Sequence, residues 1–348
     1  MNKGLKTTLK VIVIVILSIV LLLALVKVGE RIFFTGFFTN AETEFRIPGL
    51  NEGYIPQGFE KIELDGKMHF LACGYMQNKS SSRVYLLEEN GNVLKEIKLF
   101  NEDGGAFTGH AGGLTYQYTD NGNYLYISGS KCLYVFDLDD VLGDDDKATR
   151  IGKFNVSTLA EGVSGQDEVS PAYCKIFDGY LYCGSFHDQE NGYPTTSNQH
   201  FTKGEEKNHS TILKYKLDKD AEYGLSLKPE AVYSTPSTVQ GMTISGGKLF
   251  LSCSWGISIS KIHVYDLNKI ESSPLCKTDK AIWDNEYPVY FVGGDNYITT
   301  ISAPPMAEEI VYHDGRIWIM NESACNKYIF GKFTSGNYLY SYYYDTNN

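Results

Sequence analysis

His110 and Glu309 are the two residues whose types and positions best suit chemistry. His110 lies in the segment FTGHAGG, where Gly109, Gly112 and Gly113 permit a tight backbone around the imidazole. An imidazole in such a place could act as a general acid or base or as a metal ligand, or it could make a structural hydrogen bond. If the protein is an enzyme, we predict that His110 and Glu309 are catalytic residues.

A long segment from Phe186 to His209 carries a second set of polar groups. Three of the seven histidines lie in it, and two acidic residues are close to the first of them: His187, His200, His209, Asp188 and Glu190. Loops of this length in compact domains are usually functional or disordered. Nitrogen and carboxylate donors suit zinc, manganese or calcium, and we predict a divalent-cation site from His110, His187 and Glu309. A surface loop with solvated histidines is the alternative, because no HExxH or other fixed ligand spacing occurs.

Two of the seven cysteines are predicted to form a disulfide. If Asp178-Gly179 is a two-residue hairpin turn, counting outward from it places Cys174 directly opposite Cys183. Such a pair is close enough for a bridge, at the short end of disulfide geometry. Alternatively, most of the cysteines fill buried strands as small apolar side chains.

Several classes of protein are disfavoured by the sequence. It contains no GxSxG, SxxK, Walker or dinucleotide-binding motif, which argues against a serine hydrolase of the usual kind and against nucleotide-driven chemistry. The formal net charge is −11 and no basic stripe is present, so we expect no nucleic-acid partner.

A repeated hairpin pattern must position these residues. Each copy has a short strand, a DG, NG or GG turn and an apolar second strand, and the copies begin 55, 59, 69 and 68 residues apart. Asn-Gly and Asp-Gly suit tight turns because both central positions need positive φ. The five copies occupy residues 58–75, 113–130, 172–186, 241–255 and 309–323.

Two further strands follow each hairpin, which predicts an all-β protein with a β-propeller of five four-stranded blades over residues 42–348. In the last repeat we expect the third strand at Asn326–Phe333. That repeat is short, so Glu42–Pro48 is expected to complete its outer edge and close the ring, which removes free sheet edges. Six blades remain an alternative if the long fourth interval hides a degenerate copy.

One face of such a propeller collects the unusual residues, because the segments before each first strand and after each second strand meet there. Polar groups that converge on a concave mouth, with aromatic residues at the rim, form a typical ligand site. A channel mouth that is merely polar and filled with water is the alternative. We assign to ligand binding Gln57, Tyr75, His187, Gln240, Trp255, Glu308 and Glu322, and the same face holds His110, Ser170, Asp188 and Glu309.

Four segments between the predicted blades carry a resemblance to known proteins. They read IPQGF at Ile55–Phe59, TGHAGG at Thr108–Gly113, VQGM at Val239–Met242 and APPM at Ala303–Met306. With them the chain after about residue 45 resembles uncharacterised bacterial β-propellers that are secreted or membrane-anchored. It is more distantly similar to gluconolactonase-like and strictosidine synthase-like propellers. The resemblance implies a propeller fold and leaves the reaction open.

The amino terminus is predicted to anchor the protein in a membrane. Sixteen uncharged residues lie between Lys10 and Lys27, and they would span roughly 24 Å as a helix. The lysines before them predict a cytoplasmic tail (1–10), a single membrane span (11–28), a linker (29–41) and an extracytoplasmic propeller. A cleaved signal peptide and a secreted product are the alternative, but the small residues expected before a cleavage point are missing.

Two functions fit these features. The first, which the sequence favours, is a binding or scaffolding module that recognises a glycan, a peptide or an envelope partner through the channel face. The second is a metal-assisted hydrolase or lyase with its active site at the channel mouth, for which the cofactor would be a divalent cation. The first function requires fewer coincidences because no catalytic motif is present.

Overall fold

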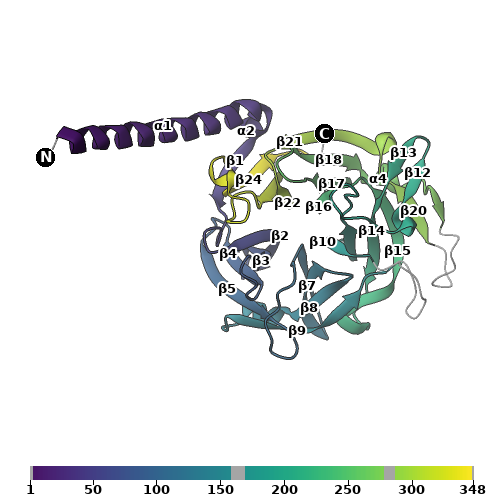
Figure 1. Ribbon diagram of the computed structural model, residues 1–348. Coiled ribbons are helices and arrows are strands. Elements are labelled where there is room, and N and C mark those ends of the chain that lie inside the picture. The colour runs from purple at the N-terminus through teal and green to yellow at the C-terminus, as the bar shows by residue number, and fades with distance from the viewer. Residues whose placement is uncertain (1–2, 158–168, 278–286, 347–348) are drawn as a thin grey trace.

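The structure is a computed structural model that describes residues 3–157, 169–277 and 287–346. Apart from a long amino-terminal helix, the chain consists mostly of β-strands, which follow one another around a central axis (Figure 1). The predicted mostly-β fold with one apolar amino-terminal helix is therefore confirmed, and the arrangement of the strands is propeller-like.

Within the described residues, the strands form five successive antiparallel groups of four. The first group contains β2 (Tyr54–Leu64), β3 (Lys67–Met76), β4 (Arg83–Glu88) and β5 (Val93–Phe100). The second contains β6 (Leu114–Thr119), β7 (Gly122–Gly129), β8 (Cys132–Asp137) and β9 (Lys147–Asn155). The third contains β10 (Pro171–Phe177), β11 (Tyr180–Ser185), β14 (Ser210–Leu217) and β15 (Leu225–Thr235). The fourth contains β16 (Val239–Ser245), β17 (Lys248–Cys253), β18 (Ser260–Asp266) and β21 (Tyr297–Ala303). The fifth contains β22 (Ala307–His313), β23 (Arg316–Asn321), β24 (Tyr338–Tyr343) and β1 (Ala41–Arg46).

Shorter elements connect or extend these groups. The outer strands β5 and β9 pair in parallel and join the first two groups into one sheet. On the outer edge of the third group, β15 pairs with β20 (Pro288–Phe291), which pairs in turn with β19 (Cys276–Lys277). A separate hairpin of β12 (Phe201–Lys203) and β13 (Glu206–Asn208) lies between β11 and β14. Two short helices, α3 (Leu138–Leu142) and α4 (Leu267–Glu271), follow the third strands of the second and fourth groups.

Tight turns set the register of the hairpins. In the first, third and fifth groups an Asp-Gly pair joins the first two strands, and both of its residues have positive φ, as at Asp178 (47°) and Gly179 (77°). Counting outward from that turn, the strands of the third group pair Phe177 with Tyr180 and Cys174 with Cys183. The predicted register of this hairpin is confirmed.

The fifth group is completed by the amino-terminal strand, as the sequence predicts. β1 pairs antiparallel with β24, with Ala41 opposite Tyr342 and Arg46 opposite Tyr338. The third strand of this group was misplaced by the sequence pattern, however. Residues Asn326–Phe333 form no strand, because Ile329 is in the left-handed region (φ 37°) and a 3₁₀ turn follows it. The third strand is β24 instead.

The hydrophobic core is divided into clusters that lie between neighbouring groups. One cluster joins the fifth group to the first through Phe45, Phe59, Phe70 and Trp318, with ring centroids of Phe70 and Trp318 4.8 Å apart. Four other clusters fill the remaining interfaces around the axis in the same way. Each group is therefore stabilised mainly by its neighbours, which is the packing of a ring of small sheets.

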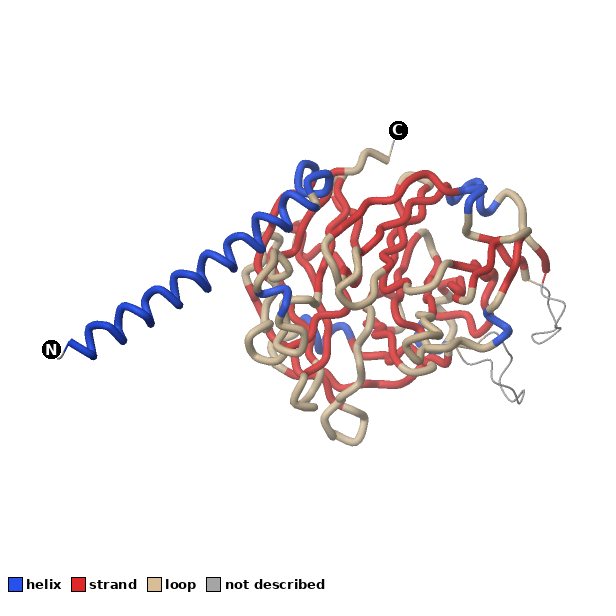
Figure 2. The backbone as a smooth tube through the Cα atoms, turned by 45° about the horizontal axis from the view of Figure 1, so that its top comes forward, coloured by secondary structure: helices blue, strands red, loops and turns tan. Residues whose placement is uncertain are grey.

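The amino-terminal helix α1 (Lys3–Phe33) projects from the strands (Figure 2) and contains an exposed apolar stretch with a mean hydropathy of 3.3. This helix meets the length and composition that a membrane anchor or a signal peptide needs. Most of the segment predicted as a linker forms helix: α1 ends at Phe33, and α2 (Thr35–Asn40) follows it. Phe37 of α2 packs against the fifth group, with its ring centroid 5.8 Å from that of Tyr340.

The predicted disulfide is not formed. Cys174 and Cys183 lie directly opposite each other, as expected, but both are buried thiols. The Cys174 thiol is directed toward the backbone carbonyl of Tyr126 in the second group, at 3.9 Å, rather than toward Cys183. Both side chains belong to the apolar cluster between the second and third groups, which agrees with the alternative that they fill space.

Candidate functional site

A pocket of about 520 Å³ lies where the first strands begin and the second strands end. Seven of the eleven residues predicted to share this face line it: Gln57, Tyr75, His110, Ser170, Gln240, Trp255 and Glu322. The other four do not line it: His187, Asp188, Glu308 and Glu309. The hairpin geometry read from the sequence therefore brings most, but not all, of the predicted residues together.

Three aromatic side chains form one wall of the pocket. The ring centroid of Trp255 lies 5.7 Å from that of Phe186 and 5.3 Å from that of Tyr193, and the last two rings are 5.5 Å apart. Trp255 follows β17, whereas Phe186 and Tyr193 belong to the long connection after β11. All three rings face the pocket, so this wall offers a broad apolar surface to a ligand.

A pair of carboxyl groups lies beside Gln57. Glu322 is 6% exposed, lines the pocket and accepts a hydrogen bond from Gln57 Nε2 at 2.8 Å. The carboxyl of Glu308 is 3% exposed and lies close to that of Glu322, which disfavours the charged form of Glu308. Desolvation, followed by the proximity of the other carboxyl, raises the pKa of Glu308, and desolvation raises the pKa of Glu322 above its usual 4.5. Glu322 therefore presents to the pocket a carboxyl group that holds a proton more readily than usual.

Tyr75, His110 and Lys327 form another part of the lining. The imidazole of His110 is stacked on the ring of Tyr75, with centroids 4.8 Å apart. Lys327 Nζ donates a hydrogen bond to the Tyr75 hydroxyl at 2.7 Å and lies above the Tyr328 ring. Desolvation, together with the charges of Lys327 and Lys79, lowers the pKa of His110, so this imidazole is neutral. A neutral imidazole can accept or donate a hydrogen bond to a ligand.

Glu309 lies deeper on the axis and is fully buried. Its Oε1 accepts hydrogen bonds from the backbone N–H groups of Met242 (2.9 Å) and Ile310 (3.2 Å). The inner strands approach closely here, since a Cβ added to Gly241 would lie only 2.6 Å from the Glu309 Cα. Burial raises the pKa of Glu309 to about 8. This position does not support the predicted catalytic role, because Glu309 joins two strands and does not reach the pocket.

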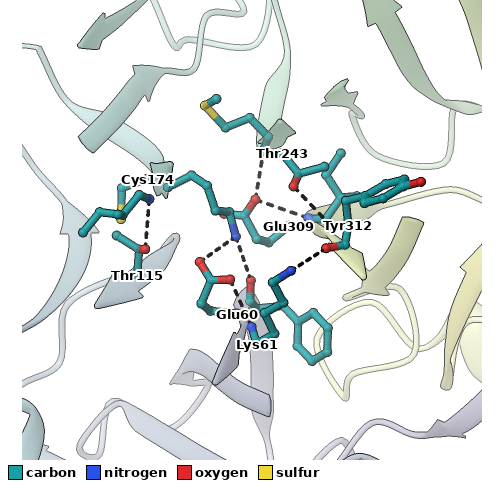
Figure 3. A network of polar contacts seen from close by, with 12 residues as sticks. Glu60, Lys61, Thr115, Cys174, Thr243, Glu309 and Tyr312 are labelled. Carbon is teal, nitrogen blue, oxygen red and sulfur yellow. Dashed lines mark hydrogen bonds and ion pairs between the residues drawn. The ribbon is translucent and has the colours of Figure 1, made fainter. Parts of the chain in front are cut away.

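Below Glu309, a buried ion pair crosses the axis (Figure 3). Lys175 Nζ from the third group lies 3.0 Å from Glu60 Oε2 of the first group and donates to the carbonyl of Phe59. Both charged side chains are less than a tenth exposed. In the same network Lys61 Nζ donates to the Tyr312 carbonyl at 2.9 Å, which links the first group to the fifth. These contacts stabilise the inner strands and belong to the fold rather than to the pocket.

The predicted metal site is not assembled. His110 is at the pocket, Glu309 is buried on the axis, and His187 faces away from the pocket toward two other histidines. Within residues 3–157, 169–277 and 287–346, no cluster of three or more His, Cys, Asp or Glu side chains is placed to hold a metal ion. The three residues come from three different environments, which hairpin geometry alone does not distinguish.

Sequence reasoning missed several pocket residues. Lys327 and Tyr328 were placed in a strand, so their position at the mouth was not foreseen. Phe186 and Tyr193 were seen only as part of a long loop. The aromatic residues that flank His187 in that loop were an available signal, because exposed aromatic side chains next to a predicted mouth often contact ligands.

Comparisons with known proteins identify no family. No protein-family description matches the sequence, and no curated protein is significantly similar to it in sequence. An exo-β-1,3-galactanase from Phanerochaete chrysosporium, solved with β-1,3-galactotriose, is similar over 87% of this chain and 64% of its own, with 10% identity and a TM-score of 0.49. A GH43_1 enzyme from Xanthomonas citri, solved with xylose, is similar over 86% and 89%, with 10% identity and a TM-score of 0.41. Likenesses this low carry no conclusion about function, and the predicted membership of a bacterial propeller family stays a prediction.

Proposed function

We propose that this protein is a membrane-anchored, extracytoplasmic propeller of five blades that binds a carbohydrate in the pocket at its channel mouth. The five strand groups would be the blades, with β1 closing the fifth. The observation that carries the proposal is the Phe186–Tyr193–Trp255 wall in the same pocket as Gln57 and Glu322. A sugar ring has an apolar C–H face for such a wall and hydroxyl groups for such polar partners.

The anchor supports the proposed location. The apolar stretch of α1 is exposed, and Lys3, Lys6 and Lys10 precede it without an acidic residue. Under the positive-inside rule that end stays in the cytoplasm, which leaves the propeller outside. The remainder of the chain has 27 basic against 42 acidic residues, after the four lysines up to Val28 are set aside. An acidic propeller is a poor partner for anionic lipid or an anionic ligand, which is compatible with a neutral carbohydrate.

Binding of defined oligosaccharides tests the proposal. The full chain in detergent is offered a glycan array that includes cellotetraose and chitotetraose, and hits are measured by calorimetry. Trp255→Ala should weaken binding by about tenfold or more, because it removes one of three rings from the apolar wall. Tyr297→Ala is the matched control, since Tyr297 is an exposed aromatic residue on β21, outside the pocket. Binding of no oligosaccharide, or equal loss in the two variants, would show that the proposal is wrong.

Hydrolysis of a glycoside is a second candidate function, and Glu322 is the observation that favours it. A carboxyl group with a raised pKa at a pocket surface can protonate a leaving oxygen, which is the role of a general acid. In this version of the enzymatic function, Glu322 takes the place that the sequence assigned to Glu309. His110, which is neutral and exposed to the pocket, would be available to accept a proton from water.

A further inference from the structure

Tyr75, His110 and Lys327 form a basic corner of the pocket that comes from other strand groups than the aromatic wall. Tyr75 lies near the end of β3 in the first group, His110 lies in the connection to the second group, and Lys327 follows β23 of the fifth group. The wall is formed by residues that follow β11 of the third group and β17 of the fourth. A ligand in the pocket therefore meets aromatic rings from one set of groups and polar side chains from another.

Two tyrosine rings hold the ammonium group of Lys327 at the lining. Its Nζ donates a hydrogen bond to the Tyr75 hydroxyl at 2.7 Å, and it lies 5.3 Å from the centroid of the Tyr75 ring and 4.8 Å from that of Tyr328. Contacts between a cation and aromatic rings are favourable, and they restrict a side chain that is otherwise flexible. The charge of Lys327 is therefore held at the pocket although the residue is exposed.

The ammonium group of Lys327 keeps donors for a ligand. A lysine has three N–H donors, and the contact with Tyr75 uses one of them. Within residues 3–157, 169–277 and 287–346, Lys327 forms no ion pair with a carboxylate. Its positive charge is therefore not neutralised by a partner in this part of the chain, and a negatively charged ligand group would supply one.

His110 adds a second donor to the basic corner. Its imidazole is stacked on the Tyr75 ring, and neither ring nitrogen has a hydrogen-bond partner among the residues that the structure describes. An imidazole carries at least one N–H group in either protonation state, so this donor is present at any pH. A ligand group with two acceptor oxygens can therefore accept from Lys327 and from His110 together.

The charge near the basic corner is positive although the chain as a whole is acidic. Lys79 is a second ammonium group whose charge acts on His110. Among the described residues Glu322 is the carboxyl group of the lining, and desolvation raises its pKa, so it carries less negative charge than an ordinary carboxylate. At physiological ionic strength, exposed charges more than about 8 Å apart are largely screened. These nearby groups, rather than the net charge of the chain, therefore set the charge that a ligand meets here.

We propose that the basic corner recognises a carboxylate, so that the pocket binds a saccharide with a uronic acid residue in preference to its neutral counterpart. One carboxylate oxygen accepts from Lys327 Nζ and the other from His110, while a sugar ring lies on the aromatic wall. This inference rests on the proposed function, because it names the class of carbohydrate that the pocket takes. A carboxylate fits better than a phosphate monoester, which carries a charge of about −1.5 to −2, because the basic corner presents a single lysine.

Matched pairs of oligosaccharides test the inference on the full chain in detergent. Cellotetraose is compared with the tetrasaccharide in which glucuronic acid replaces its non-reducing glucose, and a hyaluronan tetrasaccharide is compared with its carboxyl-reduced form. The members of each pair differ only in whether a carboxylate or a hydroxymethyl group is present. In calorimetry the acidic member of at least one pair should bind about tenfold or more tightly than the neutral member. This preference should shrink when the salt is raised from about 50 mM to about 500 mM, because salt screens an exposed charge.

Variants of two lysines in the same loop locate the effect. Lys327→Gln should remove the preference for the acidic member and change the affinity for the neutral member by less than about twofold, because the amide still donates hydrogen bonds but has no charge. Lys327→Arg keeps the charge and should retain most of the preference. Lys332→Gln is the matched control and should behave like the unchanged protein. It removes a positive charge that lies outside the pocket, where Lys332 Nζ donates to the side chains of Asn51 and Asn326.

The outcomes separate this inference from the proposed function. If sugars bind but the two members of each pair bind equally well, or if the preference persists in Lys327→Gln, the basic corner does not select a carboxylate and the carbohydrate function stands. A preference that Lys332→Gln removes as well would reflect net charge and would also overturn the inference. If no oligosaccharide binds, acidic or neutral, the proposed function itself is wrong. Should Lys327→Gln unfold, as judged by its thermal melt, the salt series on the unchanged protein decides, because a preference that salt leaves constant contradicts a role for the ammonium charge.

Discussion

At the scale of single residues, the proton on Glu322 distinguishes binding from hydrolysis. Glu322→Gln keeps a side-chain oxygen for Gln57 but cannot transfer a proton. If the pocket hydrolyses glycosides, this change should lower the release of reducing ends from the bound oligosaccharide by about 100-fold or more. The unchanged protein should also lose activity as the pH rises past the raised pKa of Glu322, since only the protonated carboxyl can donate.

Glu190→Gln is the control for that experiment. Glu190 is an exposed carboxylate in the connection that follows β11, outside the pocket, and its replacement should leave turnover unchanged. A protein that binds the sugar but releases no reducing ends at any pH would contradict the hydrolytic function and leave the binding function standing.

The same scale shows what the sequence could predict about the site. Trp255 and Gln57 reach the pocket because a residue at the end of a hairpin strand must lie at the mouth, which the turn positions already indicate. Glu308 and Glu309 are adjacent and lie where the pairing of β22 with β23 shifts in register, so simple alternation along the strand does not place their side chains. The pattern could not tell which of them meets Glu322 and which lies on the axis, because that depends on strands far away in the sequence.

At the scale of elements, β1 closes the ring. It pairs with β24 and buries Phe45 against Phe70 and Trp318. A chain that begins at Gly49 lacks this strand and should melt at least 10 °C below a chain that begins at Thr35, because loss of one buried phenylalanine alone costs about 3–5 kcal/mol. Both chains lack α1, so the difference in melting temperature isolates α2 and β1. Equal melting temperatures would mean that β1 does not stabilise the ring.

Strands were predicted correctly where turn residues define the hairpin, and the prediction failed where it depended on an apolar–polar pattern alone. The hairpin around Asp178-Gly179 is in the predicted register because its turn needs positive φ at both positions, which aspartate, asparagine and glycine adopt most readily. The segment Asn326–Phe333 alternates apolar and polar residues like a strand, but the left-handed backbone at Ile329 breaks it. Residues 29–41 were assigned to a linker without a predicted helix, yet the rings of Phe34 and Phe37 are buried, and the short helix α2 packs against the fifth group.

At the scale of the whole molecule, side-chain contacts near the axis join strand groups that are far apart in the sequence. Lys175 of the third group and Glu60 of the first meet at 3.0 Å, and Lys61 of the first group reaches Tyr312 of the fifth. The repeats predicted the ring, but no local pattern indicates which side chains meet inside it. Burial alone would lower the pKa of Lys175, whereas the carboxylates of Glu60 and Glu309 raise it, so the lysine stays charged.

The stability of the ring should therefore depend on this buried pair. Lys175→Met leaves the Glu60 carboxylate buried without its cation and should lower the free energy of unfolding by about 3–5 kcal/mol. A double variant, Lys175→Met with Glu60→Met, should recover most of that loss, because a well-packed apolar pair avoids the desolvation of both charges. Urea unfolding of the full chain in detergent measures the free energy of unfolding of the unchanged protein, of Lys175→Met and of the double variant. Lys203→Met removes the cation of an exposed pair with Asp295, at 2.9 Å, and should leave the stability unchanged. A Lys175→Met protein as stable as Lys203→Met would mean that the axial pair does not hold the ring together.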